Sequence, residues 1–480
     1  MYKLTQYKSL NIVKKNKFII LILIITLIGT VLRFQDFNNG FWWDEWTTLW
    51  FSNINFNFSD QEYWNYLSYE VHADTGSSEP TPKIVFFIMQ CYFKIFGYSA
   101  ENAKIFVLTS GILFCLFSYY LSYLVLNNKK LALLFFFLIS TNLFLIWVSQ
   151  SFRSHIFVSL VAIIQIIIFF KFFDSKNYFT KTLYVLASIL SLSVNPLNGM
   201  ILVSQFLYFI FVKKKIKTIF LLNVLIFIIY VCLNFNYLLD QLNYTTHHAT
   251  FSKSFFIGYF FNVYFASITL GGLHLLLIIF LLFKNYKKVI GKEKILFVSI
   301  CVPVTYLLLI IYSFRNGIMS PKYILYVVPL IIIWIIYYID ITKIDFKFKL
   351  SLYVILIFGN LIVVNQNYND RPIKRPPIQK TLTLINKSST KIITSNKGKL
   401  FDNYFQSLRN FKKYNLSFLE LETIKNEDDL ESVWLICRNS PRAETKIYTE
   451  TSCEDHFLNS KFKNKNVFKL QDIQLTLYKN

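Results

Sequence analysis

The chain has 480 residues, of which 54% are hydrophobic and only 16% are charged. A soluble domain carries about 25% charged residues, so this composition excludes an ordinary soluble enzyme and indicates a membrane protein. The net charge of +23 would also suit a nucleic-acid-binding protein, but the lysines stand in short clusters between apolar runs, which is the pattern of cytoplasmic loops. We therefore expect a lipid bilayer as a partner and no nucleic acid.

The N-terminal segment predicts an uncleaved first span. Residues 1–17 contain five lysines and no acid, and an apolar run from Phe18 to about residue 35 follows them. Arg33, Phe34 and Gln35 stand where a signal peptide would have small residues for cleavage. Because basic flanks stay on the cytoplasmic side, we expect the N-terminus in the cytoplasm.

Residues 36–80 predict an external loop. They hold eight acidic residues and no lysine or arginine. The apolar stretch at 82–97 is short, begins with Pro82 and carries Lys94. Since a bilayer-spanning helix needs about 20 apolar residues, this stretch suits an interfacial helix better than a span.

Ten further spans complete the expected topology and place every lysine cluster on the cytoplasmic side. We expect these spans at about 103–126, 131–148 and 152–172, then ending near 195, 213 and 238, then at 263–283, then ending near 313 and 343, and finally at 350–364. A long external loop is expected at about 238–262. Counting 82–97 as a twelfth span would move most later lysine clusters to the outer face, which is why eleven spans are preferred.

The composition changes after Asn365. Residues 366–480 are polar, with a proline-rich entry, and short apolar runs at 391–394, 433–437 and 467–478 predict strands. We expect an all-α polytopic transmembrane module over 1–365 and a small extracytoplasmic α/β domain over 366–480. Cys437 and Cys453 lie in this tail and could form a disulfide in an oxidising compartment.

The sharpest candidate for chemistry is the run Gly-Phe-Trp-Trp-Asp-Glu-Trp at 40–46, just outside the first span. Tryptophans alone would be explained by the membrane interface. Asp44 and Glu45 among them would not, because partly desolvated carboxylates cost free energy. One of them could act as a general base on an acceptor hydroxyl or amine.

Several cations are expected on the same face. Arg153 lies in Ser-Gln-Ser-Phe-Arg at 149–153, and a charge at membrane depth usually faces a cavity. Fixed cations suit a leaving phosphate, on which negative charge develops. The candidate donor-phosphate contacts are Lys83, Arg153, Lys253, Arg315 and Lys322.

Taken in order, these motifs resemble the integral-membrane glycosyltransferases of the GT-C fold, family-39 type. Its members include protein O-mannosyltransferases, lipid A aminoarabinose transferases and the RgtA/B/C/D-like group. In that family an Asp-Glu pair among aromatic residues follows the first span, and here it is Trp43-Asp44-Glu45. The resemblance implies that Asp44 is the catalytic base, with Glu45 supporting it or binding a metal.

Other family motifs are present in altered form. The run at 149–153 is similar to Ser-Gln-x-x-Arg, Pro321-Lys322-Tyr323 stands for Pro-Arg-Tyr, and Lys104 sits where the family often has arginine. The family's His-Pro-Pro-Leu and Thr-His-x-x-Gly motifs both lack their histidine here, at 79–83 and at 194–199. These losses weaken any metal or acceptor role borrowed for the two histidines.

The resemblance implies transfer of a monosaccharide from a polyprenyl-phosphate donor to an envelope glycolipid, polysaccharide or protein, with inversion at the anomeric carbon. It places the enzyme in the bacterial cytoplasmic membrane and requires no cofactor, although a divalent metal cation is compatible with it. A transporter or flippase of an anionic lipid-linked glycan is the alternative, but its usual inverted repeats are not evident. A non-catalytic envelope scaffold would leave Asp44 and Glu45 unexplained.

Overall fold

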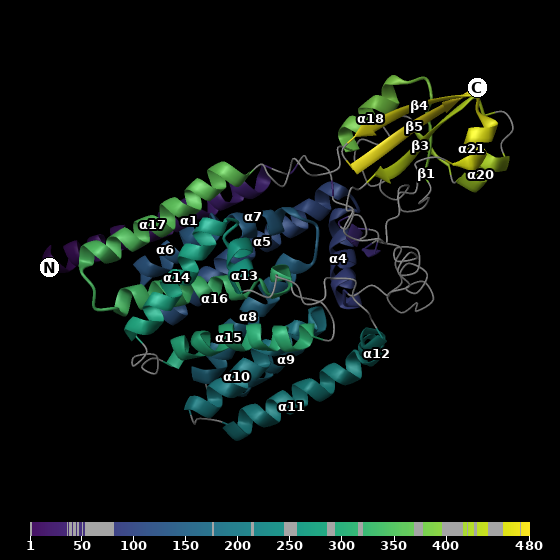
Figure 1. Ribbon diagram of the computed structural model, residues 1–480. Helices are drawn as coiled ribbons and strands as arrows, with labels where there is room; N and C mark the ends of the chain where they lie inside the picture. Colours follow the sequence, from purple (N-terminus) through teal and green to yellow (C-terminus); the bar gives the residue numbers. More distant parts are fainter. Residues whose placement is uncertain are drawn as a thin grey trace.

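The protein is an all-α polytopic membrane protein with a small mixed sheet near its C-terminus (Figure 1). The computed structural model describes residues 2–35, 37, 41, 45, 48–49, 51–52, 81–174, 177–212, 216–243, 257–285, 293–314, 320–368, 378–395, 416–419, 421–426, 430–439, 455–470 and 472–480.

Seven of the described helices are long and apolar enough to cross a bilayer. They are α1 (Tyr2–Phe34, apolar from Lys17), α5 (Ala100–Leu126), α8 (His155–Asp174), α11 (Ile216–Leu233), α14 (Ile268–Asn285), α15 (Glu293–Ser313, apolar from Lys294) and α17 (Phe346–Asn367). The pair α6 (Lys129–Ser140) and α7 (Leu143–Gln150) passes the same test together, although it is bent by 55°. Three shorter apolar helices are α9 (Tyr178–Val194), α10 (Gly199–Val212) and α16 (Val327–Ile341).

Each of the eleven expected spans therefore corresponds to one helix or to the bent pair. One expectation needs correction: the span at 131–148 is not one straight helix, because it breaks after Ser140. The Asn142 side chain accepts the backbone N–H of Leu145, so it caps α7 in place of a preceding helical turn. The stretch expected as a long loop, 238–262, is also partly helical, with α12 (Phe235–Asn243) and α13 (Ile257–Tyr264).

The stretch at 82–97 forms α4 (Lys83–Phe96), a helix of 14 residues, shorter than the about 20 that usually span a bilayer. Val85, Phe86, Met89 and Phe93 are buried on one side, whereas Ile95 is 76% exposed at its end. This one-sided burial fits the expected interfacial helix.

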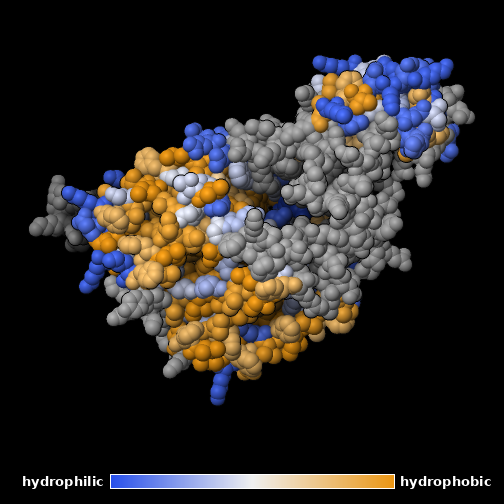
Figure 2. All heavy atoms as spheres, viewed as in Figure 1, coloured by the Kyte–Doolittle hydropathy of each residue, from blue (hydrophilic) through white to orange (hydrophobic). Residues whose placement is uncertain are grey.

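Helix α16 is the centre of the helical region. It packs against α5, α6, α14, α15 and α17, and residues 327–339 are buried without interruption. A helix that is apolar all round is one buried on all sides. Figure 2 shows hydrophobic side chains over the flank of the helical region, as expected for lipid contact, and hydrophilic ones over the C-terminal sheet.

The C-terminal sheet has five strands in the order β2-β1-β3-β5-β4. The strands are β1 (Ile392–Ser395), β2 (Ser417–Phe418), β3 (Ser432–Asn439), β4 (Asn464–Leu470) and β5 (Asp472–Lys479), with helices α18 (Ile378–Lys387), α20 (Leu421–Asn426) and α21 (His456–Lys461). Strand β1 pairs in parallel with β2 and β3, whereas β5 pairs antiparallel with β3 and β4.

Side chains of β3 alternate between the two faces of the sheet, as a strand requires. Val433, Leu435 and Cys437 join a small core with α20 and α21. On the opposite face, Trp434 donates through its indole N–H to the hydroxyl of Ser388, just after α18. Cys437 is disulfide-bonded, while Cys453 lies outside the described residues.

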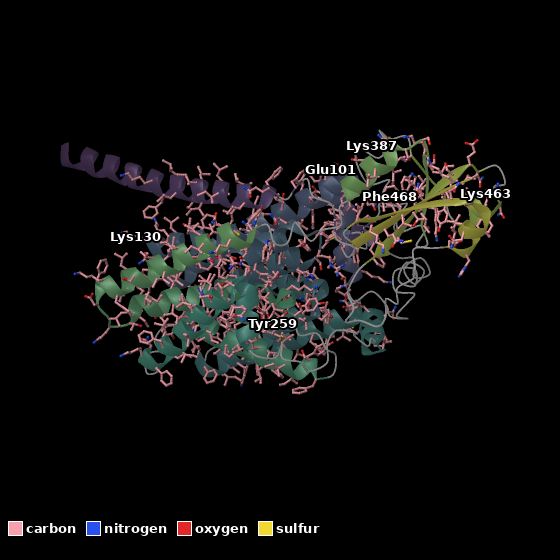
Figure 3. All side chains as sticks on the ribbon, turned by 45° about the horizontal axis from the view of Figure 1, so that its top comes forward. Glu101, Lys130, Tyr259, Lys387, Lys463 and Phe468 are labelled. Carbon is pink, nitrogen blue, oxygen red and sulfur yellow. The ribbon has the colours of Figure 1, made fainter. Side chains whose placement is uncertain are left out.

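The two ends of the helical region differ in character. Figure 3 places Lys130, in a predicted cytoplasmic cluster, at one end, and Glu101 at the end nearer the C-terminal sheet. At the start of α5, Ser99 caps the helix by accepting the N–H of Asn102. Phe37 and Glu45, which belong to the described part of 36–80, contact Lys104 of α5 and Phe152 of the motif at 149–153.

Candidate active site

Four of the seven predicted site residues are described by the structure: Glu45, Lys83, Arg153 and Lys322. Asp44, Lys253 and Arg315 lie outside the described residues. The roles assigned to all seven therefore stay predictions. The structure shows the surroundings of the four described residues.

Glu45 joins the acidic motif to the motif at 149–153. Its side chain is 1% exposed, and its Oε1 accepts the backbone N–H of Phe152 at 2.9 Å. Phe152 is fully buried, and its ring lies 5.9 Å from that of Phe41 and 6.0 Å from that of Phe93. A carboxylate that accepts a backbone N–H away from water is held firmly, because a charge-assisted hydrogen bond is about twice as strong as a neutral one.

Arg153 makes a second connection between the same two segments. Its Nη1 donates to the Thr48 hydroxyl at 3.1 Å, and the side chain is half-buried. Since Thr48 follows Glu45 by three residues, the two hydrogen bonds run side by side. The structure thus brings an acid and a cation from distant parts of the chain into one place.

The described residues between 37 and 52 are called the acidic segment here. Helix α4 packs against this segment and begins with half-buried Lys83. The Ser52 hydroxyl oxygen lies 3.3 Å from the sulfur of Met89, and the Tyr98 hydroxyl donates to the carbonyl of Leu49 at 3.1 Å. These contacts bring the helix that carries Lys83 to the acidic segment.

Lys104, in α5, places a further cation beside the acidic segment. It is 7% exposed; its Nζ donates to the Phe37 carbonyl at 2.7 Å and lies 5.6 Å from the centre of the Phe41 ring. The family resemblance pointed to this position, where the family often has arginine. A buried ammonium so close to the acidic loop adds positive charge to the site.

Lys322 belongs to a second group, built on the short helix η3 (Pro321–Ile324). Its Nζ lies 5.6 Å from the ring centre of Tyr323, whose ring meets His155 edge-on at 5.4 Å. The Asn195 side chain donates to the Tyr323 carbonyl at 3.3 Å, which ties η3 to the start of η1 (Pro196–Asn198). Asn195 stands in the family's Thr-His-x-x-Gly motif, so that motif helps to hold η3.

The two groups meet at the beginning of α8. Arg153 precedes this helix and contacts the acidic segment, while His155 is its first residue and contacts η3. A helix N-terminus carries a partial positive charge. The start of α8 therefore lies between the two groups, with Arg153 on the side of the segment that carries Glu45 and Tyr323 and Lys322 on the other.

The divalent metal cation stays a prediction, and the structure bears on it only through the residues that it describes. No group of three or more His, Cys, Asp or Glu residues in that part of the chain could hold a metal ion.

The comparison with known proteins rests on structure alone. No protein-family model matches the chain, and no curated protein matches it by sequence. The solved structure of ArnT from Cupriavidus metallidurans in the apo state is similar over 97% of this chain and 98% of that one, with 10% identity and a TM-score of 0.58. ArnT bound to undecaprenyl phosphate is similar over 95% and 97%, again at 10% identity, with a TM-score of 0.56.

This chain has the GT-C fold. The fold class expected from the sequence is confirmed, and so is the family resemblance at the level of the fold. An oligosaccharyltransferase from Archaeoglobus fulgidus is also similar, at 13% identity and a TM-score of 0.47, over 86% of this chain and 67% of that one. The GT-C fold places the chain among multi-pass membrane proteins.

Proposed function

We propose that this GT-C protein transfers a monosaccharide from a polyprenyl-phosphate donor to an envelope acceptor. The observation that carries the proposal is the pair of hydrogen bonds that holds the acidic motif against the motif at 149–153, from Phe152 to Glu45 and from Arg153 to Thr48. The fold adds support, because ArnT, which shares it over nearly its whole length, binds undecaprenyl phosphate.

In the proposed mechanism Asp44 accepts a proton from the acceptor hydroxyl or amine as its oxygen or nitrogen attacks the anomeric carbon. The bond between the sugar and the phosphate breaks, and the polyprenyl phosphate leaves with the bonding electron pair. Cations near the membrane surface stabilise the charge that develops on this phosphate, which is usually the largest catalytic contribution. The candidate cations are Lys83, Arg153, Lys253, Arg315 and Lys322.

Glu45 has a supporting role in this scheme. Its carboxylate accepts the N–H of Phe152, and in this proposal that hydrogen bond positions the acidic motif relative to the motif at 149–153. We propose that the reaction takes place on the outer face of the bacterial cytoplasmic membrane, with the N-terminus in the cytoplasm. Residues 366–480 would then form an extracytoplasmic domain following the transmembrane module at 1–365.

The decisive experiment measures sugar transfer in proteoliposomes that contain undecaprenyl-phosphate sugars and an extract of envelope acceptors. Asp44→Asn should lower kcat by about 10²–10⁴-fold, because it removes the general base. Asp174→Asn is the matched control, since Asp174 forms an ion pair with Lys294 at 3.0 Å at the other end of α8. Transfer by a correctly inserted Asp44→Asn protein at the wild-type rate would exclude the mechanism.

The same assay discriminates the rival function. A transporter of an anionic lipid-linked glycan would move the labelled donor across the vesicle membrane without releasing polyprenyl phosphate. A glycosyltransferase releases it in proportion to the glycosylated product.

A further inference from the structure

Arg33, near the end of α1, is the largest fully buried side chain among the described residues and is only 2% exposed. Its Nη1 donates to the carbonyls of Gly29 and Ser140, both at 2.9 Å. Its Nε donates to the hydroxyl of Ser149 at 3.2 Å, and its Nη2 to the sulfur of Cys115 at 3.3 Å. Within the described part of the chain, all of these acceptors are uncharged. A charged group at membrane depth held only by neutral partners is costly, and such groups usually serve function.

Two glycines make room for this guanidinium. A Cβ on Gly29 would lie 3.3 Å from Nη1 of Arg33, and a Cβ on Gly111 would lie 3.4 Å from Nε. The same Cβ on Gly111 would lie only 2.3 Å from the Ser149 hydroxyl oxygen. Helices α1, α5 and α7 therefore approach closely around the arginine, in a cradle that larger residues would fill.

The guanidinium also stabilises the break between α6 and α7. Ser140 is the last residue of α6, where the 55° bend removes the helical donors that its carbonyl would otherwise find. The guanidinium of Arg33, on α1, donates to this carbonyl in place of the missing helical N–H. An unsatisfied carbonyl inside the membrane costs free energy, so this contact favours the bent arrangement.

The direction of α7 matters because the motif at 149–153 begins in its last two residues and continues beyond its end. Gln150, its last residue, donates to the carbonyls of Leu32 and Arg33 at 3.2 and 3.3 Å. Phe152 and Arg153 then make the hydrogen bonds to the acidic segment. The position of α7 relative to α1 therefore sets where the acidic segment meets Arg153.

We propose that Arg33 is a positioning residue for the sugar-transfer reaction. It joins the end of α1 to the α6–α7 break, and through α7 it holds the acidic motif and Arg153 at their working separation. It acts through these segments and touches no substrate. This inference rests on the proposed function.

The test compares Arg33→Met, Arg33→Lys and Tyr184→Phe in the proteoliposome assay. Tyr184→Phe is the matched control, because the fully buried Tyr184 hydroxyl lies within hydrogen-bond distance of the side-chain amides of Gln205, at 2.7 Å, and Asn223, at 3.0 Å, and so joins α9, α10 and α11. Arg33→Lys keeps the charge but replaces the planar fork, which reaches several acceptors at once, by a single nitrogen.

A second readout needs no activity. Ser52 is fully buried, and its hydroxyl donates to the Thr48 carbonyl at 2.7 Å. The variant Ser52→Cys is introduced into each background, and reaction of position 52 with a water-soluble maleimide is located by mass spectrometry. The thiol should be protected wherever the acidic segment keeps its place.

Arg33→Met should lower kcat about 10²-fold, since a misplacement of about 1 Å in a site has that effect, with little change in the KM for the donor. Arg33→Lys should fall between Arg33→Met and wild type, and Tyr184→Phe should retain kcat. Labelling of position 52 should rise most in the Arg33→Met background, less in the Arg33→Lys background, and not in the Tyr184→Phe background. A wild-type kcat in Arg33→Met, an equal loss in Tyr184→Phe, or a loss of kcat with position 52 still protected would each overturn the inference.

Failure of the proposed function gives a different result. If the wild-type protein transfers no sugar from any polyprenyl-phosphate donor, only the maleimide labelling of position 52 tests whether Arg33 positions the acidic segment. Increased labelling in the Arg33→Met background then supports the positioning role, and continued protection overturns it.

Discussion

Replacing Gly111 with alanine would drive a methyl group into Ser149. The added Cβ would lie 2.3 Å from the Ser149 hydroxyl oxygen and 2.6 Å from its Cβ, well inside van der Waals contact. Rotating the serine cannot relieve the clash, because its own Cβ is also too close. The hydroxyl is held as well, since it donates to the Leu145 carbonyl at 2.6 Å and accepts from Arg33.

Helices α5 and α7 must therefore separate in the Gly111→Ala variant. Overpacking of this kind costs about 1–3 kcal/mol. Weakening the hydrogen bond from the charged Arg33 adds about 1.5–3 kcal/mol, and the better helix propensity of alanine returns about 1 kcal/mol. The net destabilisation is expected at about 1.5–5 kcal/mol, with a loss of sugar transfer because the displaced α7 carries the start of the motif at 149–153.

The assay is thermal unfolding of the detergent-solubilised protein, followed by the transfer rate. Gly272→Ala is the matched control, because a Cβ on this helical glycine meets no atom within 4 Å and should be neutral or slightly stabilising. Adding Ser149→Gly to Gly111→Ala should restore part of the lost stability by removing the clashing atoms. A Gly111→Ala protein as stable as Gly272→Ala would refute the packing argument.

Two further predictions concern the site and its sidedness. Glu45→Ala should cost about 1–3 kcal/mol of stability, because it leaves the buried N–H of Phe152 without this acceptor. Glu45→Gln retains an acceptor oxygen and should cost less. Chemical denaturation of both variants checks this prediction, and equal losses of stability would contradict it. A periplasm-active reporter inserted near position 60 should be active and one inserted at 213–217 inactive; the reverse pattern would remove the extracytoplasmic site.

The individual spans were predictable from the sequence. Lipid offers no hydrogen bonds to the backbone, so each crossing must be a run of apolar residues long enough to form a helix, and such runs are visible one at a time. The lysine clusters between them then restricted the number of spans. The same clusters argue that the short stretch at 82–97, now α4, is interfacial, because counting it as a span would move most later lysine clusters to the outer face.

Local patterns failed where a distant contact decides the structure. The apolar run at 131–148 looked like one span, but Arg33, 107 residues before Ser140, donates to the carbonyl at its break. The apolar run at 467–478 predicts a strand, yet it covers the end of β4 and most of β5, which pair antiparallel from Leu470 and Ile473. Hydropathy cannot distinguish one strand from two, because both are apolar at alternate positions.

The site divides in the same way. Residue chemistry singled out seven residues, since carboxylates and cations beside apolar spans need a reason to be there, and their roles stay predictions: Asp44, Glu45, Lys83, Arg153, Lys253, Arg315 and Lys322. The sequence offered a signal for Arg33 as well, a lone arginine ending the first span, but not its partners. Phe152 reaches Glu45 across 107 residues and Arg33 reaches Ser149 across 116, and only helix packing brings such pairs together.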